Sequence, residues 1–268
     1  MIIKDIKIFS QNFRKNNLIV NTILKTKFSF NIIFVQEPSW TTIYSIPSSR
    51  CSEEEELVGV PNHLNWLTFS RNSTSNNNFP RVVTYVNIRL SPFWFSLCKD
   101  LLSHRDISLV LFFNNNNIFY MINIYSNSSQ LALKYLKDTE VNIWNLLIMS
   151  GDFNIRDNLW NSLYSHHSSH SNDLFIIADS FNLGLSIPTN WVSTRYSDNC
   201  QDVNLVLDLM FLCFRSSELN NHVIHLEWRL ISNHTSLMIT ILLLKNIFRP
   251  RNIQSSNIAR KSIPLSSN

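Results

Sequence analysis

Short runs of β-branched and aromatic residues recur along the whole chain, and they constrain its fold more than any other feature. The Asn-rich stretch at 114–117 lies between two such runs. Because Asn tolerates the left-handed conformations of hairpin turns, we predict a β-hairpin over 107–124. The other strands are predicted at 7–9, 31–36, 66–70, 82–90, 145–151, 203–212 and 236–244.

Helical patterns are fewer than strand patterns. They predict helices at 16–27, 128–144 and 171–184, of which the last begins with capping residues and ends at Gly184. Strands therefore outnumber helices from one end of the chain to the other. This arrangement is typical of a layered α/β (α+β) protein with packed β-sheets.

The composition indicates a globular protein whose main domain spans 1–244. Of the 268 residues, 44% are hydrophobic, which is enough to form a substantial core. The longest apolar run, at 237–244, is too short to span a membrane, and the start of the chain does not resemble a secretory signal. Residues 245–268 are basic and Ser-rich, and we predict a disordered tail there.

Charge and cysteine content narrow the function classes without defining one. The net charge of +4 suits a polyanionic partner, and the four scattered cysteines indicate a reducing compartment. The histidines at 166–170 have no nearby cysteine to complete a zinc site, so exposed loop residues are predicted. The acidic run at 53–56 is predicted to form a solvated face or the start of a helix.

The stretch LLIMSGDFNIR at 146–156 places an acid and an amide at the end of an apolar run. In an extended strand, residues two apart share a face, so Asp152 and Asn154 are predicted to point toward one spot. Gly151 is predicted to let the backbone turn there. The alternative is that GDFN forms an Asx-type turn.

Two further acids follow or interrupt apolar runs. Glu37 ends the strand pattern NIIFV, where its carboxylate is a candidate ligand for Mg²⁺; the alternative is a solvated strand-end acid. Asp208 lies inside VNLVLDLMFL, and a buried carboxylate requires a partner. His234 is the candidate, because an acid that orients an imidazole and favours its protonated form yields a group that binds phosphate or transfers a proton.

The order of six motifs resembles that of the endonuclease/exonuclease/phosphatase superfamily, which includes DNase-like nucleases. The motifs are Asn12 in FSQNFRKN, Glu37 in VQEPSW, Tyr125 in NIYSN, GDFN at 151–154, LDLMFL at 207–212 and SNH at 232–234. The phrases ELVGVPNHLNWLTFSR and SGDFNIRDNLW look like the endonucleases of non-LTR retrotransposons. The resemblance covers about 12–240. It implies a four-layered sandwich of two facing mixed β-sheets flanked by helices, with an active site where strand ends meet at one edge.

The resemblance also implies roles for the matching residues around a metal ion and a water molecule. Glu37 would bind Mg²⁺, with Mn²⁺ as a substitute, and Asn12 would support the same site. Asp152 would align and deprotonate the attacking water, and Asn154 would help to hold it.

Other matching residues would act on the phosphate. The resemblance implies that Tyr125 donates a hydrogen bond to it. His234, oriented by Asp208, would contact the oxygen on which negative charge builds up during phosphodiester hydrolysis.

Two positions depart from the family's pattern. Asn233 stands where the family usually has an acid that helps with the metal, so this position is a degenerate metal ligand. Ser128 stands where the family often has a phosphate-contacting Asn, although Asn127 lies next to it. Asn127 and Ser128 are both candidate substrate-binding residues.

The implied activity is metal-dependent phosphodiester hydrolysis, most simply by a DNA-nicking endonuclease derived from a non-LTR retrotransposon. One alternative is a nucleic-acid-binding remnant whose catalysis is impaired by Asn233, and another is a different phosphoesterase. DNA is the expected partner, with no membrane and no obligate protein partner. The expected location is intracellular and nuclear.

Overall fold

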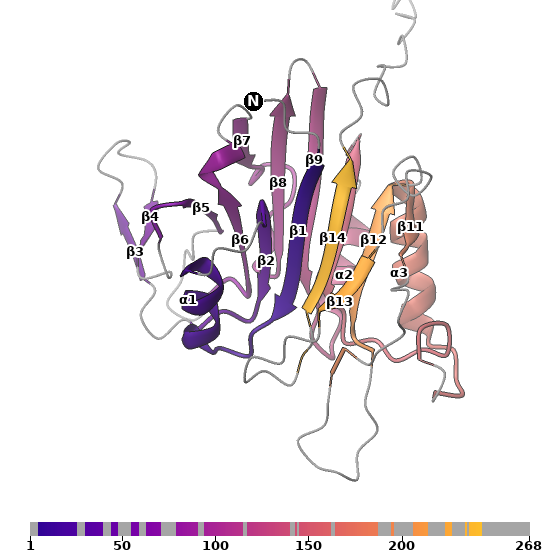
Figure 1. Cartoon of the computed structure of the whole chain (residues 1–268). Helices are drawn as coiled ribbons and strands as arrows, with labels where there is room; N and C mark the ends of the chain where they lie inside the picture. The colour runs from indigo at the N-terminus through magenta and orange to yellow at the C-terminus, as the bar shows by residue number, and fades with distance from the viewer. Residues whose placement is uncertain are drawn as a thin grey trace, which may run out of the picture.

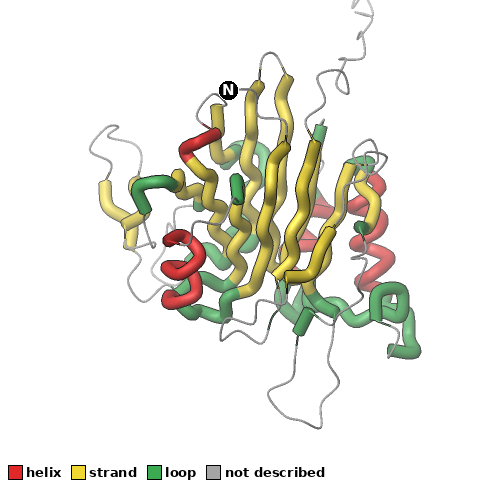
Figure 2. The backbone as a smooth tube through the Cα atoms, in the orientation of Figure 1, coloured by secondary structure: helices red, strands yellow, loops and turns green. Residues whose placement is uncertain are grey.

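The computed structural model describes the strands and helices that build the molecule (Figures 1 and 2). The described residues are 5–25, 30–39, 44–47, 55–58, 63–70, 79–90, 94–114, 117–139, 143, 145–161, 164–186, 194–195, 206–213, 223–226, 234 and 236–242.

The first sheet has six strands in the spatial order β13-β14-β1-β2-β6-β5. Their bounds are β1 Asp5–Asn12, β2 Ile32–Gln36, β5 Trp66–Phe69, β6 Val82–Asn87, β13 Val223–Leu226 and β14 Ser236–Leu242. β1 and β2 are parallel, and all other neighbouring strands are antiparallel. The sheet is therefore mixed, as predicted.

The second sheet has six strands in the order β11-β12-β10-β9-β8-β7. Their bounds are β7 Trp94–Leu97, β8 Ile107–Asn114, β9 Asn117–Tyr125, β10 Leu146–Asp152, β11 Leu183–Leu185 and β12 Asp208–Cys213. Only β9 and β10 are parallel among the neighbouring strands described. β8 and β9 form the predicted hairpin.

The remaining described elements are short. They are the two-stranded ribbon of β3 Tyr44–Pro47 and β4 Glu55–Val58, the 3-10 helix η1 Ile88–Leu90, and the helices α1 Asn17–Lys25, α2 Leu131–Asp138 and α3 Ser169–Ser180. None of these helices has the length and apolar character needed to cross a bilayer.

Three buried clusters divide the molecule into four layers. The middle cluster packs the two sheets face to face, through residues such as Ile8 and Phe34 from the first sheet and Met121 and Ile148 from the second. Alternate side chains along each strand point to the opposite face. On β1, for example, Ile8 faces the other sheet, whereas Phe9 belongs to the cluster under α1.

Helices cover the outer face of each sheet. α1 packs against the first sheet through Ile19 and Ile23, and α2 and α3 pack against the second through apolar side chains that include Leu133 and Leu174. Figure 1 shows α1 in front of the sheets and the other two helices behind them. The predicted four-layered sandwich is therefore confirmed.

Several element boundaries differ from the prediction. α3 begins at Ser169 after the N-cap Ser168, and it ends at Ser180. The chain turns at Asn182, whose φ is +57°, so Gly184 does not stop the helix; instead it pairs with β12 as part of β11. α2 is shorter than the predicted range, ending at Asp138.

Two further predictions concern the acidic run at 53–56 and the C-terminal region. Glu55 and Glu56 lie in β4, so the predicted helix start is wrong for them. The described part of the chain ends at Leu242. The predicted domain boundary near 244 and the tail at 245–268 lie outside the described residues and stay predictions.

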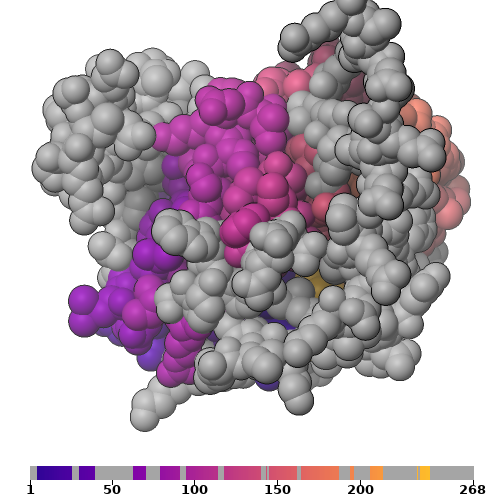
Figure 3. Space-filling view, turned by 90° about the horizontal axis from the view of Figure 1, so that it is seen from above, coloured from indigo at the N-terminus to yellow at the C-terminus, as the bar shows by residue number. Residues whose placement is uncertain are grey.

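β1 runs downward in Figure 1 and ends at Asn12. Figure 3 looks from above at the opposite end, where described residues from the middle of the chain, in magenta, come to the surface.

Candidate active site

Four strand ends meet at one edge of the sandwich. Asn12 ends β1 and pairs with the last residue of β2, which Glu37 follows. In the other sheet, Tyr125 ends β9 and pairs with Asp152, the last residue of β10. Because each sheet contains one parallel pair at its centre, the carboxyl ends of these pairs present polar groups at the same place, as at the binding edges of α/β proteins.

Asn12 joins the two sheets at this edge. Its Nδ2 donates to Glu37 Oε2 at 3.0 Å and to Asp152 Oδ2 at 2.8 Å. Two carboxylate oxygens that share one nitrogen lie within about 6 Å of each other. The structure therefore brings together two acids that are 115 positions apart in the sequence.

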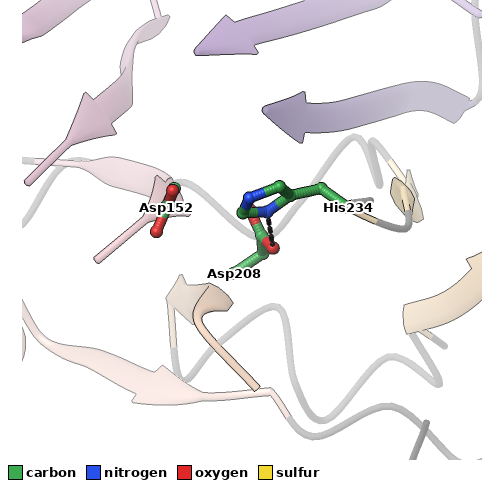
Figure 4. Close-up of side chains that lie close together, drawn as sticks. All are labelled: Asp152, Asp208 and His234. Carbon is green, nitrogen blue, oxygen red and sulfur yellow. Dashed lines mark hydrogen bonds and ion pairs between the residues drawn. The ribbon is translucent and has the colours of Figure 1, made fainter. Parts of the chain in front are cut away.

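Asp208 and His234 form a buried pair beside Asp152. His234 Nδ1 lies 2.9 Å from Asp208 Oδ2, and both side chains are almost fully buried. Figure 4 shows the imidazole bonded to Asp208 and lying near Asp152. The predicted partner of Asp208 is thus in contact with it, and Asp208 occupies the first position of β12 rather than its interior.

Neighbouring groups hold this pair in place. Thr194 Oγ1 accepts hydrogen bonds from the backbone N–H groups of Leu207 and Asp208, at 2.8 and 2.9 Å. The carbonyl of His234 accepts a hydrogen bond from Gln11 Nε2 at 2.8 Å. The backbone of Asp208 is therefore held by Thr194, and that of His234 by Gln11 of β1.

Burial and like charge raise the pKa of Asp152. Removal from water is the largest cause and the nearby carboxylate of Asp208 is the second, and together they raise its pKa to about 7 although His234 and Asn12 act in the opposite direction. Asp152 therefore changes charge near neutral pH.

The pKa of His234 is raised as well. Burial lowers this pKa, but the charge of Asp208 and its hydrogen bond outweigh that effect. Stability from this pair is therefore present at low pH and is lost as the pH rises through the raised pKa of the imidazole. The geometry favours an imidazolium.

GDFN forms a turn after the strand. Asp152 Oδ1 accepts a hydrogen bond from the backbone N–H of Asn154 at 3.0 Å, and Asn154 has a φ of +50°. The predicted extended arrangement is therefore wrong for Asn154, and the alternative Asx-type turn is observed. Its side-chain amide donates to the carbonyl of Ser126 at 2.9 Å, so Asn154 fixes the loop beside Asp152.

Gly151 serves a different purpose from the one predicted. A Cβ atom there would lie 1.8 Å from the carbonyl oxygen of Ile124 on β9. Gly151 lies inside β10 and does not form the predicted turn. Instead, its missing side chain permits the close approach of β9 and β10.

Tyr125 lies between charged groups. Burial, followed by the nearby carboxylates of Glu37 and Asp152, raises the pKa of its phenol, which therefore stays a hydrogen-bond donor at neutral pH. The guanidinium carbon of Arg81 lies 4.5 Å from the centroid of its ring.

The three remaining candidate residues are less closely tied to the site. Asn127 Oδ1 is buried without a hydrogen-bond partner in the described part of the chain, and Ser128 is exposed; both follow the end of β9. Asn233 lies outside the described residues. Gln130 bonds the neighbouring loops together, since it accepts from Ser126 Oγ at 2.6 Å and donates to the carbonyl of Phe153 at 3.1 Å.

The donor set fits a hard divalent cation. Glu37 and Asp152 supply carboxylate oxygens on either side of Asn12. Buried Asp208 Oδ1 has no hydrogen-bond partner among the described residues. Oxygen ligands of this kind suit Mg²⁺ or Mn²⁺.

A second grouping also has metal-like spacing. One ligand atom each from Asp152, Asp208 and His234 lie within 4.8 Å of one another, the one such group found among the described residues. However, His234 Nδ1 is already bonded to Asp208. Because Mg²⁺ prefers oxygen to imidazole, we favour the Glu37 side for the metal.

Of the histidines at 166–170, His167 takes a structural part, whereas His170 lies in α3, so the predicted loop position is wrong for it. His167 Nδ1 lies 2.8 Å from Asp157, a buried acid that also accepts from the backbone N–H of Ser168 at 2.8 Å. This arrangement fixes the start of α3. His167 is 41% exposed, consistent with the predicted loop position.

Sequence reasoning missed a buried polar layer beneath the site. Gln36 Nε2 donates to Asn123 Oδ1 at 2.7 Å and to Ser10 Oγ at 3.2 Å, which links the two sheets. Asn123 Nδ2 donates to the carbonyl of Val83 at 3.0 Å. The available signal was a polar residue one or two positions before a site residue in otherwise apolar strands.

Comparison with known proteins supports the fold. No family model and no curated protein sequence matches the chain. The endonuclease domain of TRAS1, a telomere-specific non-LTR retrotransposon, is similar with a TM-score of 0.64 and 13% identity, over 90% of this chain and 100% of that one. The AP endonuclease LMAP from Leishmania major gives a TM-score of 0.65 and 10% identity, over 90% of this chain and 89% of that one.

A third neighbour is the 3'-5' exonuclease NExo from Neisseria meningitidis, with a TM-score of 0.54 and 16% identity, over 89% of this chain and 100% of that one. The chain therefore has a DNase-like fold. The predicted resemblance is confirmed as a likeness of structure, and it includes an endonuclease of a non-LTR retrotransposon.

Proposed function

We propose that this protein is a metal-dependent phosphodiesterase that nicks DNA. The observation that carries the proposal is the gathering of Asp152, the Asp208–His234 pair and the Asn12-bridged Glu37 at one edge of the sandwich. Three of the solved structures with a similar fold are nucleases by name, which supports phosphodiester hydrolysis.

Asp152 is the general base. In-line hydrolysis needs a water molecule that is aligned and deprotonated, and a carboxylate whose pKa is about 7 is well matched to that task. The Asx turn holds its Oδ1, and Asn12 holds its Oδ2. Asn154 contributes by fixing this turn, so its role is positioning.

His234 stabilises negative charge on the phosphate. Its Nδ1 is committed to Asp208, which sets the orientation of the ring and favours the imidazolium. The other ring nitrogen can then donate to a phosphate oxygen on which charge develops. Tyr125 is the second donor to the phosphate.

Glu37 is the proposed Mg²⁺ ligand, and Asn12 supports the same site by donating a hydrogen bond to its carboxylate, with Asn233 as the degenerate ligand suggested by the sequence. When bound, the ion would supply positive charge that offsets the developing charge of the phosphodiester. Asn127 and Ser128, just after the end of β9, remain proposed substrate contacts.

A supercoiled-plasmid assay tests the proposal. With Mg²⁺ the protein should convert supercoiled DNA to open circles, and Glu37→Ala should reduce the rate by at least about 100-fold, since it removes a metal ligand. Arg89→Met, in η1 beyond the other end of β6, is the control and should nick normally.

Asn233 makes a second outcome informative. If the natural protein is inert and Asn233→Asp nicks DNA, the chain is the catalytically impaired remnant that the sequence offers as an alternative. Hydrolysis of inositol phosphates without action on DNA would instead support another phosphoesterase. Inactivity of every variant on all substrates would contradict the proposal.

A further inference from the structure

Arg81 borders the candidate site, although none of the sequence motifs includes it. It directly precedes β6, and its carbonyl accepts a hydrogen bond from the backbone N–H of Glu37 at 2.8 Å. Its guanidinium lies over the ring of Tyr125. Arg81 therefore contacts the two sides of the site from which the metal and the phosphate would be bound.

Two partners fix the orientation of this guanidinium. Fully buried Asp106 accepts from Arg81 Nε at 2.6 Å and from Arg81 Nη2. A bidentate carboxylate and an aromatic face together hold the plane of the group. Asp106 is tied in turn to the site, because its carbonyl accepts from the backbone N–H of Tyr125 at 2.9 Å.

The remaining edge of the guanidinium is available to a ligand. No group among the described residues accepts a hydrogen bond from Nη1 of Arg81, and 21% of the side chain is exposed. The adjoining candidate site holds the carboxylates of Glu37 and Asp152. A polyanion approaching these acids needs a cation beside them, and an arginine edge suits a phosphate oxygen.

We infer that Arg81 binds a phosphate oxygen of the substrate strand through its outward edge, while Asp106 and Tyr125 hold it in position. This inference rests on the proposed function and names a residue that binds the polyanion. The competing explanation is purely structural, because Arg81 and Asp106 also connect the beginning of β6 in one sheet with the beginning of β8 in the other.

Salt dependence of binding separates the two roles. Each phosphate contact contributes about 0.9 to the slope of log affinity against log salt for duplex DNA. The double variant Arg81→Met with Asp106→Leu removes the pair without changing net charge and leaves no buried charge unpaired. Binding of a fluorescent DNA duplex is measured by anisotropy in EDTA at several salt concentrations, so that cleavage does not interfere.

The variants have distinct expected results. The double variant should fold, as judged by circular dichroism. Its plot of log affinity against log salt should be shallower than that of the natural protein by about 0.9 in slope. Arg89→Met, at an exposed arginine of η1 beyond the far end of β6, should keep the natural slope. If the apolar pair does not fold, Arg81→Gln with Asp106→Asn keeps a hydrogen-bonded pair and carries the same expectation.

Failure of the inference is distinguishable from failure of the proposed function. Equal slopes for the natural protein and the folded double variant, or an equal loss in Arg89→Met, would overturn the role of Arg81 and leave the nuclease proposal standing. If the natural protein itself shows no salt-dependent binding to the duplex, both the phosphate contact and DNA as the substrate are overturned.

Discussion

At the scale of single residues, Asp152 has the environment that most affects the proposed chemistry. It is buried, it lies near the carboxylate of Asp208, and its pKa is raised to about 7. An acid with a raised pKa favours folding when it is protonated. Its contribution to stability is therefore present below about pH 4, the pKa of an unfolded Asp, and is lost as the pH rises toward 7.

Asp152→Asn tests this electrostatic account. Nicking should fall by about a thousand-fold, because a general base contributes about 10²–10⁴ in rate. In metal-free buffer, the melting temperature of the natural protein should decrease between pH 4 and 7 by more than that of Asp152→Asn, which cannot ionise. Parallel melting curves for the two proteins over this range would contradict the raised pKa.

The role of a single residue was predictable only in part. The pairing of Asp208 with His234 followed from the physical need of a buried carboxylate for a partner. The geometry of Asn154 did not follow, because an i, i+2 argument holds only while the strand continues, and β10 ends at Asp152. Arg81 gave no signal, since its partner Asp106 is close to it only in the folded chain.

At the scale of elements, the close pairing of β9 with β10 positions the site. Tyr125 and Asp152 end these strands in register, and the preceding pair is Gly151 with Ile124. The absent side chain at Gly151 lets the backbones approach. A larger residue would push apart the two strands whose ends carry the proposed general base and the proposed phosphate donor.

Gly151→Ala should therefore destabilise the fold strongly. The added methyl group would meet backbone, which cannot move aside without breaking strand pairing, so a loss of at least about 3 kcal/mol is expected in chemical denaturation. Gly184→Ala in the edge strand β11 is the control and should cost about 1 kcal/mol or less. Similar losses at the two glycines would show that close approach is not the cause.

Strands were easier to predict than their ends. The apolar runs of β2, β8, β9 and β14 are long enough to identify by composition, and their predicted positions agree with the structure to within two residues. The short strands β3, β4, β7, β11 and β13 were missed, because three- or four-residue segments carry little pattern of their own. Their formation depends on neighbouring strands that supply the hydrogen bonds.

At the scale of the whole molecule, two sheets act as halves of one site. The first sheet brings Asn12 and Glu37, and the second brings Tyr125, Asp152 and Asp208. The buried hydrogen bond between Gln36 and Asn123 fixes their separation just beneath the site. Composition and periodicity predicted packed sheets. The prediction that residues of both sheets share one site came only from the order of motifs, because spacing along the sequence gives no distance between sheets.

A crystal soaked with MnCl2 and a short DNA strand would test most directly whether the two sheets form one site. Anomalous scattering locates the ion, and the map locates the phosphate. We predict a manganese peak at about 2.2 Å from a carboxylate oxygen of Glu37, with a phosphate oxygen within hydrogen-bond distance of His234. A peak remote from Glu37, or a phosphate bound away from His234, would contradict the account.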